Sequence, residues 1–314
     1  MITKATGTVQ MRLKRYLALL FLPMWQSNPV YMASLGIVIA SIPLELAQAE
    51  GVELNIKSLL KRDFGVDLNI SGGMGKSLAD PIVVLDKDPS RTRSTQMGVL
   101  RGLGKGRGVL WRTLSRSFVS SEGSLVEQVK IETKNVTADQ VITQTENYYF
   151  DVTASEGIID APTKVDVRFP VKEFSFAYEV GWLHYDGFID NEIENPGVGI
   201  SIAYGAPGIK GTIFIYDNNR TDIGTSLQGS LVISEFEASR RQILNSYPDV
   251  KMWGEAGRNN SLHLQAFNVG DQMSLIGVGV HQQSFLKFRA TYVNDPILLD
   301  VIKDTVSSLD LLLK

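Results

Sequence analysis

Short runs in which apolar and polar residues alternate recur along the sequence, and they constrain the fold more than any other feature. In Phe174–Val180 the side chains of Phe174, Phe176 and Tyr178 fall on one side of the chain. This pattern is typical of a β-strand with one buried face. Other runs rich in β-branched and aromatic residues are Val109–Val119, Leu125–Thr133, Val141–Val152, Val198–Tyr204, Ile209–Tyr216, Leu262–Phe267, Ser274–His281 and Phe285–Val293. We therefore expect sheets to dominate the fold.

Four segments indicate helices instead. Leu231–Leu244 and a final segment from Pro296 place their apolar residues on one helical face. Leu54–Arg62 is amphipathic, and Ser94–Leu103 is a further candidate. Two strand-like pieces, Val66–Ile70 and Ile82–Leu85, lie between the first two helices. The order of strands and helices predicts an α+β fold of antiparallel sheets with helices packed against them.

Turn-forming residues between 154 and 165 divide the strand-rich part of the chain into two blocks. Domains cluster near ~100–150 residues, so two domains are expected in a chain of this length. The predicted organisation is an N-terminal signal peptide at 1–49, an α+β domain at 50–155 and a second α+β domain at 165–314.

The first 49 residues have the features of an export signal. Arg12, Lys14 and Arg15 precede two apolar pieces, Leu17–Trp25 and Val30–Ile42, and Ala47-Gln48-Ala49 fits the small residues that a signal peptidase accepts. The expected location is periplasmic or secreted. The alternative is an uncleaved anchor in the inner membrane that faces the periplasm. Neither apolar piece reaches the ~20 residues of a spanning helix, and we expect no membrane span after cleavage.

Composition excludes several chemistries. The sequence contains no cysteine, so disulfides, thiolate metal sites and cysteine nucleophiles are absent. Cleavage after Ala49 removes four of the 31 basic residues and one of the 34 acidic residues, which leaves 27 against 33. A mildly acidic chain is not expected to bind nucleic acid.

The C-terminal block carries a family resemblance. Phe285–Tyr292 runs into the terminal helix, and Tyr204–Gly208 and Thr212–Asp217 precede it. From about Lys172 to Lys314, this arrangement resembles the PsbP-like fold of photosystem-associated extrinsic proteins and small bacterial exported proteins. The resemblance implies an accessory or binding protein more often than an enzyme. Residues 50–155 carry no comparable resemblance.

Two glycine-rich segments do not match nucleotide-binding loops. A phosphate-binding loop that includes Ser71–Ser77 would need glycine at position 70, which is Ile70, and the segment runs into Pro81. In Gly102–Gly108, Arg107 occupies the third glycine position of a dinucleotide fingerprint, and the segment precedes a strand rather than opening a helix. We interpret both as glycine-rich turns or loops, and the sequence predicts no cofactor.

Basic residues are segregated between Asp88 and Glu122, a stretch without an acidic residue. Such segregation favours an anionic docking surface for an envelope protein or another anionic envelope component. The alternative is a solvated loop whose charges pair with carboxylates elsewhere in the chain. The candidate partner-binding residues are Arg91, Arg93, Arg101, Lys105, Arg107, Arg112 and Arg116.

The three histidines lie far apart, and none has a second ligand at helical metal spacing, so no metal site is predicted. Trp182, His184 and Asp186 are pocket candidates, because aromatic groups beside His and Asp can line a binding site; a packed turn or sheet edge is the alternative. The segment with Asp186, Asp190, Glu192 and Glu194 lacks the ligand order of an EF-hand and predicts an exposed acidic loop.

No Gly-x-Ser-x-Gly nucleophile elbow is present. The expected function is therefore that of an exported, non-enzymatic binding or assembly accessory protein of the cell envelope. The competing hypothesis is an envelope hydrolase whose site is assembled around His184 and Asp186 by folding.

Overall fold

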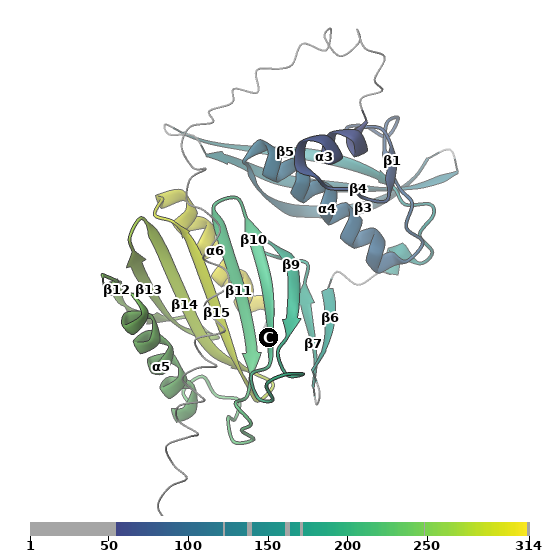
Figure 1. Cartoon of the computed structure of the whole chain (residues 1–314). Coiled ribbons are helices and arrows are strands. Elements are labelled where there is room, and N and C mark those ends of the chain that lie inside the picture. Colours follow the sequence, from purple (N-terminus) through teal and green to yellow (C-terminus); the bar gives the residue numbers. More distant parts are fainter. Residues whose placement is uncertain are drawn as a thin grey trace, which may run out of the picture. The chain divides into compact units, whose positions relative to one another are not determined.

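The first half of the described chain forms a five-stranded sheet covered on one face by two helices (Figure 1). The computed structural model describes residues 55–121, 123–136, 140–160, 164–169, 172–247 and 249–312. The predicted signal peptide at 1–49 lies outside these residues. The elements of this half are α3 (Ile56–Phe64), β1 (Ile70–Gly72), β2 (Ile82–Val84), α4 (Pro89–Arg107), β3 (Leu110–Ser121), β4 (Ser124–Val136) and β5 (Val141–Asp151).

The strand order of this sheet is β1-β2-β5-β4-β3, and only the β2–β5 pair is parallel. Leu60 of α3 and Leu100 of α4 are buried in one core with Val129 and Phe150 of the sheet. Strand residues alternate between this core and the opposite face, and that alternation made β3, β4 and β5 predictable.

Helix α4 is longer than the predicted Ser94–Leu103. Asp88 caps its start by accepting a hydrogen bond from the Arg91 backbone, and Gly108 ends it with a φ of 63°. The segment from Gly102 to Arg107 therefore belongs to the helix, and its interpretation as a loop was wrong. Gly104 packs against the indole of Trp111 so closely that a Cβ would lie 2.6 Å from it. This contact explains why a weak helix former occupies the position.

The second half is built on an eight-stranded antiparallel sheet with the order β12-β13-β14-β15-β11-β10-β9-β8. Its strands are β8 (Glu179–Val180), β9 (Leu183–Asp190), β10 (Ile200–Ala206), β11 (Ile209–Tyr216), β12 (Lys251–Arg258), β13 (Leu262–Val269), β14 (Gln272–His281) and β15 (Ser284–Val293). A separate two-stranded ribbon comprises β6 (Lys164–Phe169) and β7 (Lys172–Ala177).

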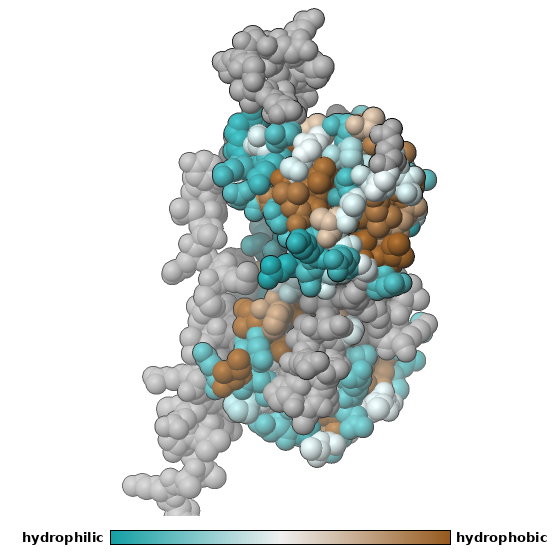
Figure 2. All heavy atoms as spheres, turned by 90° about the vertical axis from the view of Figure 1, so that its right-hand side faces the viewer, coloured by the Kyte–Doolittle hydropathy of each residue, from teal (hydrophilic) through white to brown (hydrophobic). Residues whose placement is uncertain are grey.

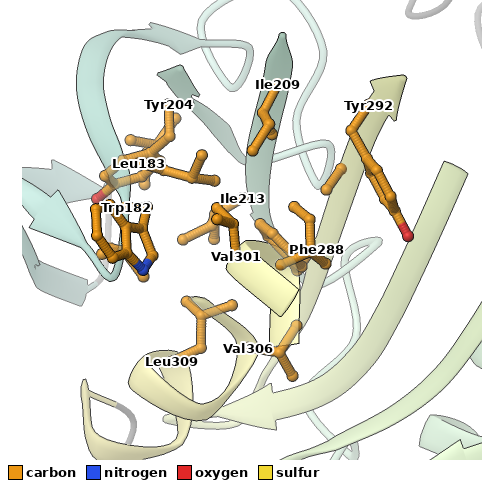
Figure 3. Close-up of a cluster of buried hydrophobic side chains, with 14 of the residues drawn as sticks. Trp182, Leu183, Tyr204, Ile209, Ile213, Phe288, Tyr292, Val301, Val306 and Leu309 are labelled. Atoms are coloured by element: carbon orange, nitrogen blue, oxygen red, sulfur yellow. The ribbon is translucent and has the colours of Figure 1, made fainter. Parts of the chain in front are cut away.

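Two helices pack on opposite faces of the eight-stranded sheet. Along β15, Leu286 and Phe288 belong to the core that includes α6 (Pro296–Leu312), whereas Phe285 belongs to the core that includes α5 (Ser230–Ser246). In the close-up, Val301 of α6 lies beside Ile213 and Phe288 (Figure 3). The two-residue alternation of the strands thus supplies two separate apolar surfaces.

Helix α5 packs on one face of the sheet, where it contacts β14 and β13. Another part of the same face is not covered by any element that the structure describes. Ser201 and Ala203 of β10, Thr212 of β11 and Arg289 of β15 lie on this face and keep partial exposure. On the opposite face their strand neighbours Ile202, Ile213 and Phe288 are buried. We call the α5-side face of β10, β11 and β15 the open sheet face.

The predicted α+β class is confirmed: helices pack against largely antiparallel sheets. The strand expected at Val66–Ile70 was wrong, since β1 begins only at Ile70. Strands β6, β9 and β12 were not predicted. Residues 54–314 group as one unit, and the division into two domains near 154–165 stays a prediction.

Candidate interaction surfaces

Two of the seven candidate basic residues form a buried charge network with Glu127. The Glu127 carboxylate is fully buried and accepts hydrogen bonds from Arg93 and from Arg116, the latter at 3.2 Å. Gln96 Nε2 donates to the same carboxylate at 2.9 Å. Burial raises the pKa of Glu127, but the two guanidinium groups outweigh this and hold its pKa below the usual value. This network ties α4 to β3 and β4.

Three further candidates also pair with carboxylates of the chain. Arg101 donates to the Tyr185 carbonyl at 3.0 Å and forms an ion pair with Asp186. Arg107 contacts Glu146 at 2.6 Å, and Arg112 contacts Glu132 at 2.7 Å. Exposed pairs of this kind each contribute little to stability, but they neutralise much of the charge that the sequence places in this segment.

Arg91 and Lys105 are the two remaining candidates. Both are exposed on α4, and neither forms an ion pair within the part of the chain that the structure describes. The solvated helix face is therefore less basic than the sequence indicates. A partner-binding role for Arg91, Arg93, Arg101, Lys105, Arg107, Arg112 and Arg116 stays a prediction.

The glycine-rich segment Ser71–Ser77 directs its backbone donors at its own neighbours. Met74 N donates to Asp80 Oδ2 at 3.0 Å, and Gly73 N donates to the Pro81 carbonyl at 3.0 Å. Lys76 binds Glu146 at 2.9 Å. Burial raises the pKa of Glu146, but hydrogen bonds from Arg107 and Lys76 outweigh it and lower the pKa to about 2. These donors do not converge on a phosphate-sized anion, in agreement with a glycine-rich turn.

His184 is buried between the two sheets. Its ring stacks on Trp111 of β3 at a centroid distance of 3.7 Å, and its Nε2 donates to the Trp111 carbonyl at 3.0 Å. Burial lowers the pKa of His184 to about 3, so the ring is neutral at ordinary pH. Glu179 lies 3.8 Å from Nδ1, and its carboxylate accepts two hydrogen bonds from Thr113. The histidine therefore joins the sheets and has no access to solvent.

Trp182 and Asp186 do not complete a site with His184. Trp182 is buried against α6, and its Nε1 donates to Asp304 at 3.3 Å. Asp186 is exposed and forms its ion pair with Arg101. The three candidates thus have different surroundings, and the packed sheet edge, the alternative interpretation, describes them better than a pocket does.

A cavity of about 10 Å³ lies under α4 and is lined by apolar groups with Arg107, Thr133 and Tyr148. Ligand pockets measure about 300–1,000 Å³, so this cavity is too small for an organic substrate. Among the described residues, no three His, Asp or Glu side chains are placed to hold a metal ion.

The loop after β9 exposes an isoleucine and is held in place by hydrogen bonds. Ile193 is 82% exposed. Glu192 Oε1 accepts hydrogen bonds from the backbone of Gly197 at 2.8 Å and of Gly199 at 2.7 Å. Pro196 O accepts one from the Asn219 side chain. We call residues 191–199 the acidic loop.

Hydrogen bonds and a glycine determine the backbone conformation of the acidic loop. Asn191 N donates to the Gly199 carbonyl at 2.9 Å, and Asn195 N donates to the Asn191 carbonyl at 2.9 Å. At Gly199 the φ is 75°, and a Cβ would lie 1.8 Å from the Ile215 carbonyl oxygen. Only glycine fits there, so the path of the loop beside β11 depends on Gly199.

Two more large apolar side chains are exposed just before the acidic loop. Phe188 is 48% exposed and Ile189 is 64% exposed, on opposite faces of β9. Figure 2 shows one side of the molecule, where hydrophobic residues form several separate areas between hydrophilic ones. Phe188, Ile189 and Ile193 thus expose three large apolar side chains within six residues of the chain.

Comparison with known proteins gives little support for any assignment. No protein-family model and no curated protein matches this chain. Two solved structures are similar to it, both of the immunity protein TplEi of the T6SS from Pseudomonas aeruginosa. The complex with "L" peptide is 8% identical with a TM-score of 0.25, and the apo form is 9% identical with a TM-score of 0.26. Each comparison covers 71% of this chain and 85% of that chain. These TM-scores are too low to support a conclusion about fold or function.

The exposed loop expected at Asp186, Asp190, Glu192 and Glu194 is a loop only in part, since Asp186 and Asp190 belong to β9. The hydrogen bonds that hold the acidic loop were not predicted. The signal that could have found it is a charge pattern: residues 173–209 contain six Asp or Glu and no Lys or Arg. The hydrogen bonds of Glu192 could not be inferred, because they depend on the turn at Gly197 and Gly199.

Proposed function

We propose that this chain is a non-enzymatic accessory protein of the cell envelope that binds another protein through its acidic loop. The observation that carries the proposal is Ile193, 82% exposed at the head of a loop held by its own hydrogen bonds. A preformed loop loses little conformational entropy when it binds, so most of its contact energy contributes to affinity.

The charge around Ile193 defines the partner. Glu194 is exposed, and the run from 173 to 209 contains no basic residue. Complementary charge accelerates encounter and excludes wrong partners. The expected partner has a small apolar pocket for Ile193 with Lys or Arg side chains at its rim.

The residues that the structure describes around His184 do not assemble a hydrolase site. A general base must reach its substrate and hold a pKa near the working pH. His184 is buried, and its pKa is about 3; its ring faces Trp111 and Glu179 rather than a serine or threonine hydroxyl. The geometry around His184 and Asp186 therefore favours a structural role.

A photo-crosslinking amino acid at position 193 tests the binding proposal directly. In cells, Ile193 replaced by the crosslinker should capture one main partner, whose contact peptide contains apolar residues flanked by Lys or Arg. Adding Glu194→Lys should reduce the yield about tenfold, since opposite charges become like charges. Glu194 accepts no hydrogen bond within the described structure, so the loop should keep its conformation.

The matched control is a crosslinker at Ile159, which is 61% exposed but lies far from the acidic loop in sequence. The proposal is wrong if position 193 captures the same proteins as position 159, or if the captured peptide is acidic.

The envelope location rests on the export-type segment at 11–49. We propose cleavage after Ala49, so that N-terminal sequencing of the periplasmic protein should read Glu50-Gly51-Val52. The structure contains no helix long and apolar enough to cross a membrane within its described residues. An intact N-terminus on membrane-bound protein would favour the anchored alternative. The PsbP-like resemblance of 172–314 is compatible with an accessory role.

A further inference from the structure

The first part of strand β5 has an unpaired edge. Strand β4 pairs with β5 along its whole length, whereas β2 pairs with it only at Phe150 and Asp151. Within the part of the chain that the structure describes, no second strand pairs with Val141–Tyr148. Every second residue of a strand directs its backbone N–H and C=O to the side away from a given neighbour, so these groups are unpaired here. We call Val141–Thr145 the free edge, because its five side chains are also exposed.

The composition of the free edge favours pairing with another strand. Its sequence is Val-Ile-Thr-Gln-Thr, in which all residues but the glutamine are β-branched. It contains no charged residue and no proline, the residues with which natural proteins protect an edge strand. Val141 is 41% exposed and Ile142 is 37% exposed. A neutral segment of this composition on an open edge is expected to accept another strand.

The outer strands of the two larger sheets are protected in other ways. Strands β1 and β8 have only three and two residues. In β12 the register shifts between Trp253 and Gly257. In β3 it shifts between Thr113 and Ser115, and the Thr113 N–H donates to Glu179. Short strands and bulges oppose pairing with another chain, and the free edge has neither, which favours a role in docking.

The surroundings of the free edge limit which strand can pair with it. The Tyr149 N–H donates to the Gly75 carbonyl at 2.9 Å, so the glycine-rich turn occupies this side of β5 beyond Tyr148. An incoming strand must therefore leave the sheet before it reaches Gly75. The start of β5 itself meets this condition, because the chain reverses between Val136 and Val141, which are paired.

We propose that two copies of this chain pair through their free edges, antiparallel and about a two-fold axis at Thr143. In this register Thr143 lies opposite its own copy, Val141 lies opposite Thr145, and Ile142 lies opposite Gln144. Cross-strand pairs of threonine and other β-branched residues are favourable, and no like charges meet. The contact is the same on both copies, so it closes at two and covers both edges. The inference goes beyond the proposed function and does not depend on it.

The charges beside the free edge do not oppose this pairing. Lys134 of β4 lies next to Thr143. Across the axis, the two Lys134 residues would be three strand spacings apart, about 14 Å. This exceeds the Debye length of about 8 Å at physiological ionic strength, so their repulsion is largely screened. A second copy thus supplies a neutral strand that starts at a hairpin turn and fits the free edge without a charge conflict.

Sedimentation equilibrium of the purified chain tests the pairing. We expect a monomer–dimer equilibrium with a dissociation constant of about 1–100 μM, because a five-residue strand pair buries less than the ~1,600 Å² of a standard interface. Amide hydrogen exchange of the free edge should slow as the concentration passes through this range, since paired N–H groups gain protection.

Substitutions at Thr143 test the register. In the single chain, the carboxylate of Thr143→Glu lies next to Lys134, so the unfolding transition should not fall. In the dimer it would face its own copy, and association should weaken about fivefold or more. Thr143→Lys should weaken association similarly. An equal mixture of the Glu and Lys variants should recover the natural affinity, because opposite charges then meet at the axis.

Ser117→Glu is the matched control, since Ser117 is exposed on the outer strand β3 and its substitution should leave association unchanged. Four results would overturn the proposal: a monomer at all concentrations up to about ten times the expected range, growth beyond the dimer, unchanged association of Thr143→Glu, or an equal loss in Ser117→Glu. A mixture of the Glu and Lys variants that stays monomeric would contradict the two-fold axis at Thr143. The crosslink from Ile193 reports on the acidic loop and is read separately.

Discussion

Replacing Glu127 by glutamine should lower the free energy of unfolding by about 3–5 kcal/mol, the usual cost of breaking a buried ion pair from one side. The substitution keeps the shape of the side chain but removes its charge. Arg93, which is 5% exposed, would then remain charged without a counter-ion, and Arg116 would lose its carboxylate. Urea unfolding followed by circular dichroism measures the change.

Two comparisons make this result specific. Asp63→Asn removes the exposed partner of Arg62 and should cost less than about 1 kcal/mol. Arg93→Met combined with Glu127→Leu removes both buried charges and should recover part of the loss, because an apolar pair carries no desolvation penalty. A loss below about 1 kcal/mol for Glu127→Gln would show that the network is dispensable.

Acidification from pH 7 to 4.5 should destabilise the fold through His184 by about 2–3 kcal/mol. Burial lowers the pKa of His184 to about 3 in the folded chain, whereas an unfolded histidine titrates near 6.5. Below pH 6.5 the unfolded chain therefore binds a proton that the folded chain does not bind, and the free energy of unfolding falls as the pH falls. The effect ends near pH 3, where the folded ring also protonates.

Unfolding curves at pH 7, 6, 5 and 4.5 for the natural chain and His184→Gln test this. Glutamine can keep the hydrogen bond to the Trp111 carbonyl and does not titrate, so the variant should lose about 2–3 kcal/mol less over this range. Glu179 faces the ring, and burial raises its pKa. As the pH falls, the folded chain therefore protonates Glu179 before the unfolded chain does, so Glu179 adds stability where His184 removes it. Glu179→Gln measured alongside separates the two groups. Parallel curves for the natural chain and His184→Gln would contradict the assignment.

The strands that could be predicted are those in which every second residue of the sequence is apolar and faces a buried core. Strand β11 has the predicted bounds, Ile209–Tyr216, because the Gly-Ala-Pro-Gly turn marks its start and every second residue enters one core. Helix α6 begins at the predicted Pro296, where a missing backbone donor costs nothing. In both cases the local signal and the tertiary environment agree.

The missed strands lack that agreement. In β9, a bulge shifts the register between Tyr185 and Gly187, so the alternation along the strand is interrupted. In β12, Gly254 and Gly257 reduce the strand signal, and pairing with β13 supplies the order instead. Val66–Ile70 shows the opposite error: Val66 and Leu68 pack against the core that α3 and α4 share, and only Ile70 pairs in a ladder.

The sequence alone determined the class of fold, most strand positions and the separation of charge, because these depend on neighbours within a few residues. Only the tertiary structure decided what the charges do. It placed Glu127 under Arg93 and Arg116, Asp186 beside Arg101 and Glu146 beside Arg107, and it thereby turned much of a basic stretch into internal pairing. Coulombic energy depends on distance and local dielectric, and in a folded chain both are set by residues far apart in sequence.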